Sequence, residues 1–340
     1  MADVICFGEI MMRLTPPGYA RFLQASSFEL DFGGAEANVA VALAQLGVSV
    51  DMVTAFPEND LGQAAINVLR SYGVGVGKIL RREGRVGIYF HEKGASQRPS
   101  RVIYDRKGSS AALADPSEYN WEEILGGARL FHFTGITPAI SSAAAQAAED
   151  ALKSAKRLGI KVSCDLNFRK NLWDAETAGK TMGRLLRYTD VLSCGLDDLA
   201  AMFGIKTDAP DRDNIPESEY SRIGAELKER FGITTAVFSM RKSISSSEND
   251  YALRIYDAET GEIYDSAEYH IIIVDRIGGG DAAAAGVIYG MLKGYSPQKT
   301  ADFAAACAAF KHSVEGDFTS ASKTEIDALI ENGGSGRVSR

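Results

Sequence analysis

The segment from Ile271 to Gly290 combines residue types that could hold a phosphate and accept a proton. Four β-branched residues, 271–274, predict a buried strand, and a run of small residues over 282–291 favours a helix. Between them lie Asp275, three consecutive glycines and Asp281. Glycines allow positive φ and a close backbone approach, while the first turn of a helix has unpaired N–H groups and the positive end of its dipole. The segment therefore predicts an anion site made of main-chain amides.

Asp281 follows these glycines directly, where a carboxylate could take a proton from a hydroxyl that attacks a bound phosphate. The same spacing is also typical of an ordinary glycine turn in which the aspartate only caps a helix. Neither the dinucleotide pattern nor the Walker pattern is present, because the turn is not G-x-G-x-x-G and no Lys-Ser or Lys-Thr pair follows it. On spacing alone, the catalytic and the structural interpretations both stay open.

A second glycine turn lies near the N-terminus. Gly33 and Gly34 precede Asn38 and a helix expected over Val39–Leu46, which Gly47 would end. This turn, too, could bind a ligand or could have only a structural role.

The elements that must position these residues alternate regularly. Apolar runs at Val4–Phe7 and 50–54 predict strands, and from residue 129 onward strands and helices follow each other in turn. Such alternation predicts an α/β fold, a doubly wound and mostly parallel sheet with helices on both faces, and ligands at the carboxyl ends of its strands. We expect one domain over 1–330 and a frayed tail over 331–340. Further strands are expected over 130–134, 161–166, 191–194 and 235–239. Helices are expected over 141–158, 177–187, 196–203, 219–231, 297–314 and 323–330.

Period-two patterns in two segments predict a small additional sheet. Residues 13–32 suggest a hairpin or flap, and within 85–108 the apolar Val86, Ile88 and Phe90 alternate with other residues. A small sheet with one exposed face, inserted early in an α/β chain, fits a lid over a cleft. Tyr89 and Tyr104 would then share a face that meets substrate, or would be ordinary strand aromatics.

Composition excludes several classes of protein. The 340-residue chain is 45% hydrophobic and 24% charged with a net charge of −8, which argues against nucleic acid or an anionic membrane as partner. Its four cysteines and four histidines lack metal-ligand spacing. The N-terminus lacks a leader pattern, and no stretch of about 18 apolar residues occurs, so we expect a cytoplasmic protein.

The two glycine turns resemble the signatures of the ribokinase-like (PfkB) carbohydrate kinases. DRIGGGDA matches their D-x-x-G-x-G-D-A, and GGAEANVAVALAQLG matches their N-terminal signature. The resemblance implies that Gly278, Gly279 and Gly280 form an anion hole, that Asp281 is the general base, and that Gly33, Gly34 and Asn38 hold sugar hydroxyls. It also implies ATP as cofactor, with Mg²⁺ held through ATP and water and without a dedicated protein metal site.

Within this family, the sequence most resembles the 2-keto-3-deoxygluconate kinases. The phrases that carry this resemblance are GEIMMRLTPPG, EKGASQRPSRVIYDR, FHFTGITPA, KVSCDLNFRKNLW and KHSVEGDF. They imply phosphorylation by ATP of the C6 hydroxyl of 2-keto-3-deoxy-D-gluconate. Residues matching Gly34, Tyr89, Tyr104, Arg106, Arg169 and Asp317 would contact the keto acid, with Arg169 also close to the transferred phosphate. Guanidinium groups suit a carboxylate substrate.

The nucleotide side is less well matched. Asp198 stands where the family usually has the glutamate of N-x-x-E, Gly195 replaces its asparagine, and Ala283 replaces a common phenylalanine. Position in the chain suggests that Ser239, Arg241 and Lys311 also contact the nucleotide. These departures leave two alternatives: a kinase for another sugar, such as 2-keto-3-deoxygalactonate, fructose or another hexose, or a weakly active sugar- or nucleotide-binding homologue. The lid is also a candidate surface for a homodimer.

Overall fold

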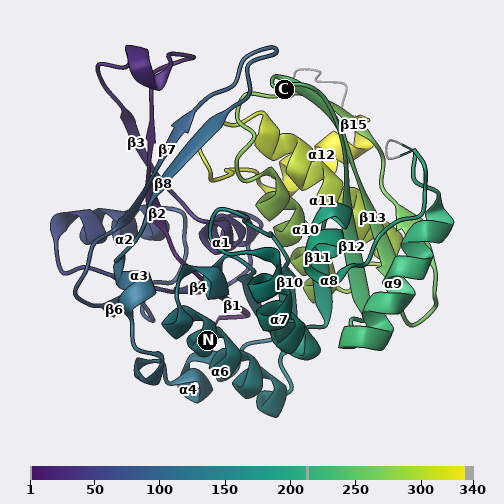
Figure 1. The fold of residues 1–340 in the computed structure, drawn as a ribbon, viewed down its shortest axis with the longest axis horizontal. Coiled ribbons are helices and arrows are strands. Elements are labelled where there is room, and N and C mark those ends of the chain that lie inside the picture. The colour runs from purple at the N-terminus through teal and green to yellow at the C-terminus, as the bar shows by residue number, and fades with distance from the viewer. Residues whose placement is uncertain (1, 212–213, 334–340) are drawn as a thin grey trace.

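The computed structural model describes residues 2–211 and 214–333, and this part of the chain is organised around a nine-stranded sheet (Figure 1). Its strand order is β14-β13-β12-β11-β10-β9-β1-β4, and β15 also pairs with β13. The strands are β1 (Val4–Phe7), β4 (Val50–Val53), β9 (Leu130–Thr134), β10 (Lys161–Asp165), β11 (Val191–Cys194), β12 (Thr235–Ser245), β13 (Glu248–Asp257), β14 (Ile263–Asp265) and β15 (Tyr269–Ile272). From β4 to β12 they run parallel, and β13, β14 and β15 pair antiparallel.

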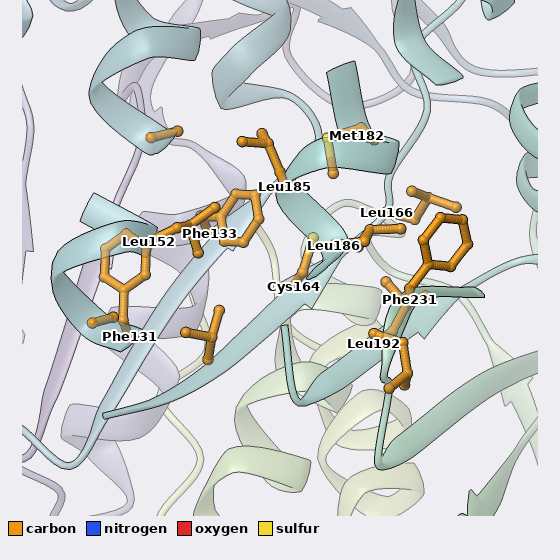
Figure 2. Packing of buried hydrophobic residues seen from close by; sticks show 14 of the residues in the cluster. Phe131, Phe133, Leu152, Cys164, Leu166, Met182, Leu185, Leu186, Leu192 and Phe231 are labelled. Atoms are coloured by element: carbon orange, nitrogen blue, oxygen red, sulfur yellow. The ribbon is translucent and has the colours of Figure 1, made fainter. Parts of the chain in front are cut away.

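Helices cover both faces of the sheet because alternate strand residues are apolar on both sides. In β1, Ile5 and Phe7 join one buried cluster, whereas Val4 and Cys6 join the other. The first cluster, part of which Figure 2 shows, packs against α6 (Ser142–Leu158), α7 (Ala175–Leu185), α8 (Leu196–Phe203) and α9 (Glu217–Phe231). The second packs against α1 (Ala35–Gln45), α2 (Asp60–Ser71), α10 (Gly279–Lys293), α11 (Pro297–His312) and α12 (Lys323–Glu331). Short helices are α3 (Ser110–Leu113), α4 (Trp121–Leu125) and α5 (Thr137–Ile140). The predicted fold class is confirmed.

A four-stranded sheet, here called the small sheet, projects from one side of the main sheet (Figure 1). Its order is β3-β2-β7-β8, with β2 (Met11–Thr15), β3 (Glu29–Gly33), β7 (Gly87–Glu92) and β8 (Arg101–Asp105); β5 (Ala55–Phe56) and β6 (Leu80–Arg81) form a separate pair. Tyr89 and Tyr104 lie directly opposite each other, with ring centroids 6.0 Å apart. The two tyrosines therefore share a face, as the alternation predicted.

The tip of the small sheet touches the tip of the β12–β13 hairpin. The backbone N–H of Ser246 donates to the carbonyl of Ser96 at 2.8 Å, and the N–H of Ser96 donates to Ser247 Oγ at 3.0 Å. Figure 1 shows the two hairpins meeting near the top of the view. The small sheet is thus joined to the main sheet at its tip as well as at its base.

Two predictions about elements were wrong. The segment 271–274 is not a buried strand: β15 covers Tyr269–Ile272 at the outer edge of the sheet, where Ile272 is 76% and Val274 41% exposed. Successive side chains of an extended segment point to opposite faces, and here one of these faces is open to solvent, so only Ile271 and Ile273 of the four are buried. Helix α1 begins at Ala35, not at Val39, so Asn38 lies inside its first turn.

Helix α12 ends at Glu331, and residues 334–340 of the expected tail lie outside the described residues. Within residues 2–211 and 214–333, each helix is too short or too polar to cross a membrane.

The contact between α10 and α11 generates a stability prediction. A Cβ at Gly286 would lie 2.6 Å from Ala304 Cα, so Gly286→Ala must push the two helices apart. We expect a loss of about 1–3 kcal/mol in the free energy of unfolding, measured in urea. Gly183→Ala, in α7, is the matched control because its Cβ would meet only ordinary contacts at 3.8 and 3.9 Å. The control should gain about 0.5–1 kcal/mol; equal effects at both sites would contradict this account.

Candidate active site

The glycine turn at the start of α10 is shaped by close packing. Gly278 is the N-cap, with φ of 87°, and a Cβ there would overlap the carbonyl oxygen of Asp317. A Cβ at Gly279 would overlap the ring of His312. Gly280, in contrast, is exposed and has no atom within 4 Å of a Cβ position. Two of the three glycines are therefore required by the fold, and the third leaves the amides of the first turn open to a ligand.

Asp281 and Asn38 bring the two glycine turns together. Asn38 Nδ2, in the first turn of α1, donates to Asp281 Oδ2 at 2.6 Å. Burial raises the pKa of the Asp281 carboxyl to about 7, although the Asn38 hydrogen bond opposes this shift. A carboxyl with a pKa near neutrality, beside the amides of a helix start, can exchange a proton with a hydroxyl at that position.

The N-terminal turn is packed as closely as the C-terminal one. A Cβ at Gly34 would overlap the carbonyl oxygen of Glu9, and one at Gly33 would overlap the carboxylate of Asp317. The N–H of Gly34 also donates to Asn38 Oδ1 at 3.3 Å. These contacts hold the side-chain amide of Asn38 with its Nδ2 toward Asp281.

Asp317 joins several of the predicted substrate residues. The Tyr89 hydroxyl donates to Asp317 Oδ1 at 2.5 Å, and Asn38 Nδ2 lies 3.4 Å from Asp317 Oδ2. Burial raises the pKa of the Asp317 carboxyl, although Arg13 and Tyr89 oppose the shift. Three predicted substrate residues, Gly33 in β3, Asn38 in α1 and Tyr89 in β7, thus lie against the carboxylate of Asp317 in the loop after α11.

Sequence reasoning missed the cation that holds this cluster. Arg13, on β2, is 1% exposed; its Nη1 donates to Asp317 Oδ1 at 2.8 Å and its Nη2 to Asp275 Oδ2 at 2.5 Å. Asp275 in turn accepts hydrogen bonds from the backbone N–H groups of Ile277 and Gly316 at 3.1 and 3.2 Å. A signal was present, because Arg13 is the single charge after Glu9 in the apolar phrase GEIMMRLTPPG. Charges in apolar runs are often buried and paired.

Arg106 lies at the edge of the same region but already has a partner. Its Nε donates to Glu9 Oε2 at 2.7 Å, a second guanidinium nitrogen contacts the same oxygen, and the group lies 5.8 Å from the centre of the Tyr104 ring. Among the described residues, Glu9 Oε1 has no hydrogen-bond partner. The predicted contact of Arg106 with a substrate carboxylate stays a prediction.

Arg169 lies in the exposed segment after β10, near three carboxylates. Its charge lowers the pKa values of Asp281, Asp165 and Asp198, although burial raises all three more strongly and brings that of Asp165 to about 7. Asp198 accepts a hydrogen bond from the N–H of Phe168 at 3.2 Å. Arg169, Asp198 and the base candidate therefore belong to one electrostatic site.

The three remaining nucleotide candidates lie on two elements, β12 and α11. Ser239 and Arg241 are exposed on β12. Lys311 is 0% exposed, donates to the carbonyl oxygen of Val314 at 3.1 Å, and packs under Gly278. Its side chain thus lies beneath the glycine turn, and its predicted contact with nucleotide stays a prediction. Within the described residues, groups of three or more His, Cys, Asp and Glu side chains able to hold a metal ion are absent.

Comparison with known proteins gives this geometry its context. A model of the pfkB family carbohydrate kinases matches residues 1–324. The chain belongs to this family. It is 30% identical to a 2-dehydro-3-deoxygalactonokinase from Haloferax volcanii (98% of both chains) and 28% identical to a 2-dehydro-3-deoxygluconokinase from Thermoproteus tenax (93% of this chain, 90% of that one). The solved structure of a Thermotoga maritima 2-dehydro-3-deoxygluconokinase superposes with a TM-score of 0.93, at 43% identity over 97% of this chain and 100% of that one.

Membership of the pfkB family confirms the resemblance drawn from the two glycine turns, and with it the prediction of a sugar kinase. The roles of individual residues in this pfkB chain rest on the geometry described above.

The different environments of Gly278 and Gly280 generate a second prediction. Gly278→Ala combines a strained φ with a backbone overlap, so it should lower the melting temperature strongly. Gly280→Ala has open space for its methyl group and should leave the melting temperature within about 2 °C of the unmodified protein. Thermal unfolding of both variants checks this. Equal destabilisation would show that the amides of the turn are not held as the structure places them.

Proposed function

We propose that the chain transfers the γ-phosphoryl group of ATP to the C6 hydroxyl of a 2-keto-3-deoxy sugar acid, with 2-keto-3-deoxy-D-gluconate preferred. The observation that carries this proposal is the Asp281 carboxyl, held by Asn38 at 2.6 Å beside the open first turn of α10. The sugar class is supported by the relatives, which are named as kinases for the gluconate and the galactonate forms.

In the proposed reaction, Asp281 accepts the proton of the C6 hydroxyl as the new O–P bond forms and the bond between the γ-phosphorus and the β-phosphate oxygen breaks. The amides of 277–280 and the dipole of α10 stabilise the charge that develops on the phosphoryl oxygens. Arg169 adds a positive charge near the Asp281 carboxyl. Such transfers depend mainly on positioning and electrostatics, so a modest base is sufficient.

The sugar acid would be held at two ends. The hydroxyl end would meet Gly33, Gly34, Asn38 and Asp317, whose oxygen and amide groups suit hydroxyl donors and acceptors. The carboxylate would be repelled by Asp317, so we place it toward Tyr104 and Arg106. One terminal nitrogen of Arg106 does not contact Glu9 and could donate a hydrogen bond to the carboxylate of the sugar acid.

ATP would lie on the side of Ser239 and Arg241. Mg²⁺ bound to its phosphates would neutralise their charge, and Asp165 and Asp198 are the carboxylates near Arg169 that could reach its water ligands. The small sheet would act as a lid that excludes water. The exposed Val102, Ile103 and Tyr104 on β8 support the further proposal of a homodimer through this sheet.

A second candidate substrate is the galactonate epimer, favoured by the Haloferax volcanii relative, which aligns with 98% of this chain.

Coupled assays of ADP release with both epimers, fructose and ribose test the proposal. We expect the highest kcat/KM with 2-keto-3-deoxy-D-gluconate and at least about a hundredfold lower value with fructose or ribose, which lack the carboxylate. Preference for a hexose would overturn the substrate assignment, and ligand binding without turnover would favour a binding homologue.

The role of Asp281 predicts a pH dependence. The base must be deprotonated, and its pKa is about 7, so kcat/KM should rise about tenfold per pH unit up to 7 and level off above it. Asp281→Asn should lower kcat by about 10²–10⁴-fold and leave ATP affinity, measured by calorimetry, nearly unchanged. Ordinary turnover in this variant would remove the base assignment.

A further inference from the structure

Arg13 is a charged residue of the small sheet that is buried against the main body of the protein. It lies on β2, and its guanidinium group uses every nitrogen: Nε donates to Thr15 Oγ1 at 2.9 Å, Nη1 to Asp317 at 2.8 Å, and Nη2 to Asp275 at 2.5 Å. Nη2 also lies 2.8 Å from His91 Nδ1 on the neighbouring strand β7. One side chain thus connects two strands of the small sheet with two segments of the C-terminal half.

Each carboxylate partner of Arg13 belongs to a segment that shapes the candidate active site. Asp275 precedes the glycine turn and accepts from the N–H groups of Ile277 and Gly316, so it sets the path of the chain into that turn. Asp317 holds Tyr89 and lies 3.4 Å from Asn38, which is the residue that contacts Asp281. Arg13 is therefore linked through Asp275 to the glycine turn. Through Asp317 it is linked to Asn38, which contacts Asp281.

The charges in this cluster balance. Arg13 and Lys311 are two buried cations, and Asp275 and Asp317 are two buried anions. The pKa of Arg13 is raised because Asp275 and Asp317 outweigh the effect of burial. Burial and the charge of Arg13 lower the pKa of His91 to about 4, so at neutral pH its imidazole is uncharged and accepts from the guanidinium group. Lys311 adds a second positive charge beneath Gly278, and its predicted contact with nucleotide stays a prediction.

We propose that Arg13 is a positioning residue that locks the small sheet onto the glycine turn and orients Asp317 and Asn38 so that Asp281 faces the hydroxyl to be phosphorylated. The inference deepens the proposed function and rests on it. It requires a guanidinium group, because only a planar fork reaches Asp275 and Asp317 at the same time, and an ammonium group is a single point charge.

Kinetics of Arg13→Lys test this inference. The variant keeps the charge, and its folding is checked by thermal unfolding. We expect kcat to fall about 10²-fold and the KM for the sugar acid to rise, since a displacement of about 1 Å in a reacting group costs this much. The KM for ATP should change less than about threefold, because the nucleotide side does not contact Arg13. Arg98→Lys is the matched control: Arg98 lies in the loop between β7 and β8 and donates to buried Glu92 at 2.9 Å and to the carbonyl of Tyr19, away from the candidate site.

The pH profile separates positioning from a general loss of stability. Asn38 holds the pKa of Asp281 down, so a displaced Asn38 should move the apparent pKa of kcat/KM upward in Arg13→Lys and not in Arg98→Lys. Besides Asn38, the charged groups that face Asp281 are Glu36, Asp165, Arg169, Lys311 and Asp317, and neither variant substitutes any of them.

A second variant covers the case in which Arg13→Lys does not fold. Thr15→Val removes only the acceptor of Arg13 Nε and keeps the side-chain volume, so it should fold and lower kcat by a few fold with the same upward shift in apparent pKa. A folded Arg13→Lys with unchanged kcat and pH profile would overturn the inference, as would an unchanged Thr15→Val if Arg13→Lys is unfolded. An unmodified protein inactive on every sugar acid would instead overturn the proposed function, and the positioning role of Arg13 with it.

Discussion

The absence of a side chain at a few positions is the constraint on which the candidate site depends. At Gly278 and Gly279 the start of α10 packs against the loop after α11 and against His312, and at Gly33 and Gly34 the start of α1 packs against Asp317 and the backbone of Glu9. Only hydrogen atoms fit at these contacts. The two helix starts can therefore approach until Asn38 and Asp281 form a hydrogen bond, although they are 243 residues apart in the chain.

Ion pairing allows this close approach although charged side chains are buried at the contact. Carboxylates as buried as Asp275 and Asp317 would be costly if unpaired, and their pairing with Arg13, with Lys311 nearby, removes most of that cost. The same burial raises the pKa of Asp281, whose partner Asn38 is uncharged, to about 7. The charged cluster thus stabilises the junction, while the carboxyl group outside it keeps the ability to titrate near neutral pH.

The sequence predicted what depends on local pattern and left out what depends on distant contacts. Strand β1, the facing of Tyr89 and Tyr104, and the glycine-to-helix turn before Asp281 follow from periodicity and turn chemistry over a few residues. Strand β13 was not predicted, because the polar run before residue 250 looks like a loop and is in fact an extended hairpin with exposed residues. The role of Arg13 depends on partners 262 and 304 residues away, which single-sequence reasoning cannot place.

Two of the contacts that attach the small sheet to the rest of the protein differ greatly in strength. At its base, Arg13 is bound to two carboxylates out of contact with water, and breaking such pairs costs roughly 3–5 kcal/mol. At its tip, Ser96 makes two hydrogen bonds to Ser246 and Ser247, each worth only about 1 kcal/mol. Thermal fluctuation therefore releases the tip long before the base. Any opening of the small sheet would therefore begin at the Ser96 contact, with the ion pairs of Arg13 and the Asn38–Asp281 hydrogen bond still formed.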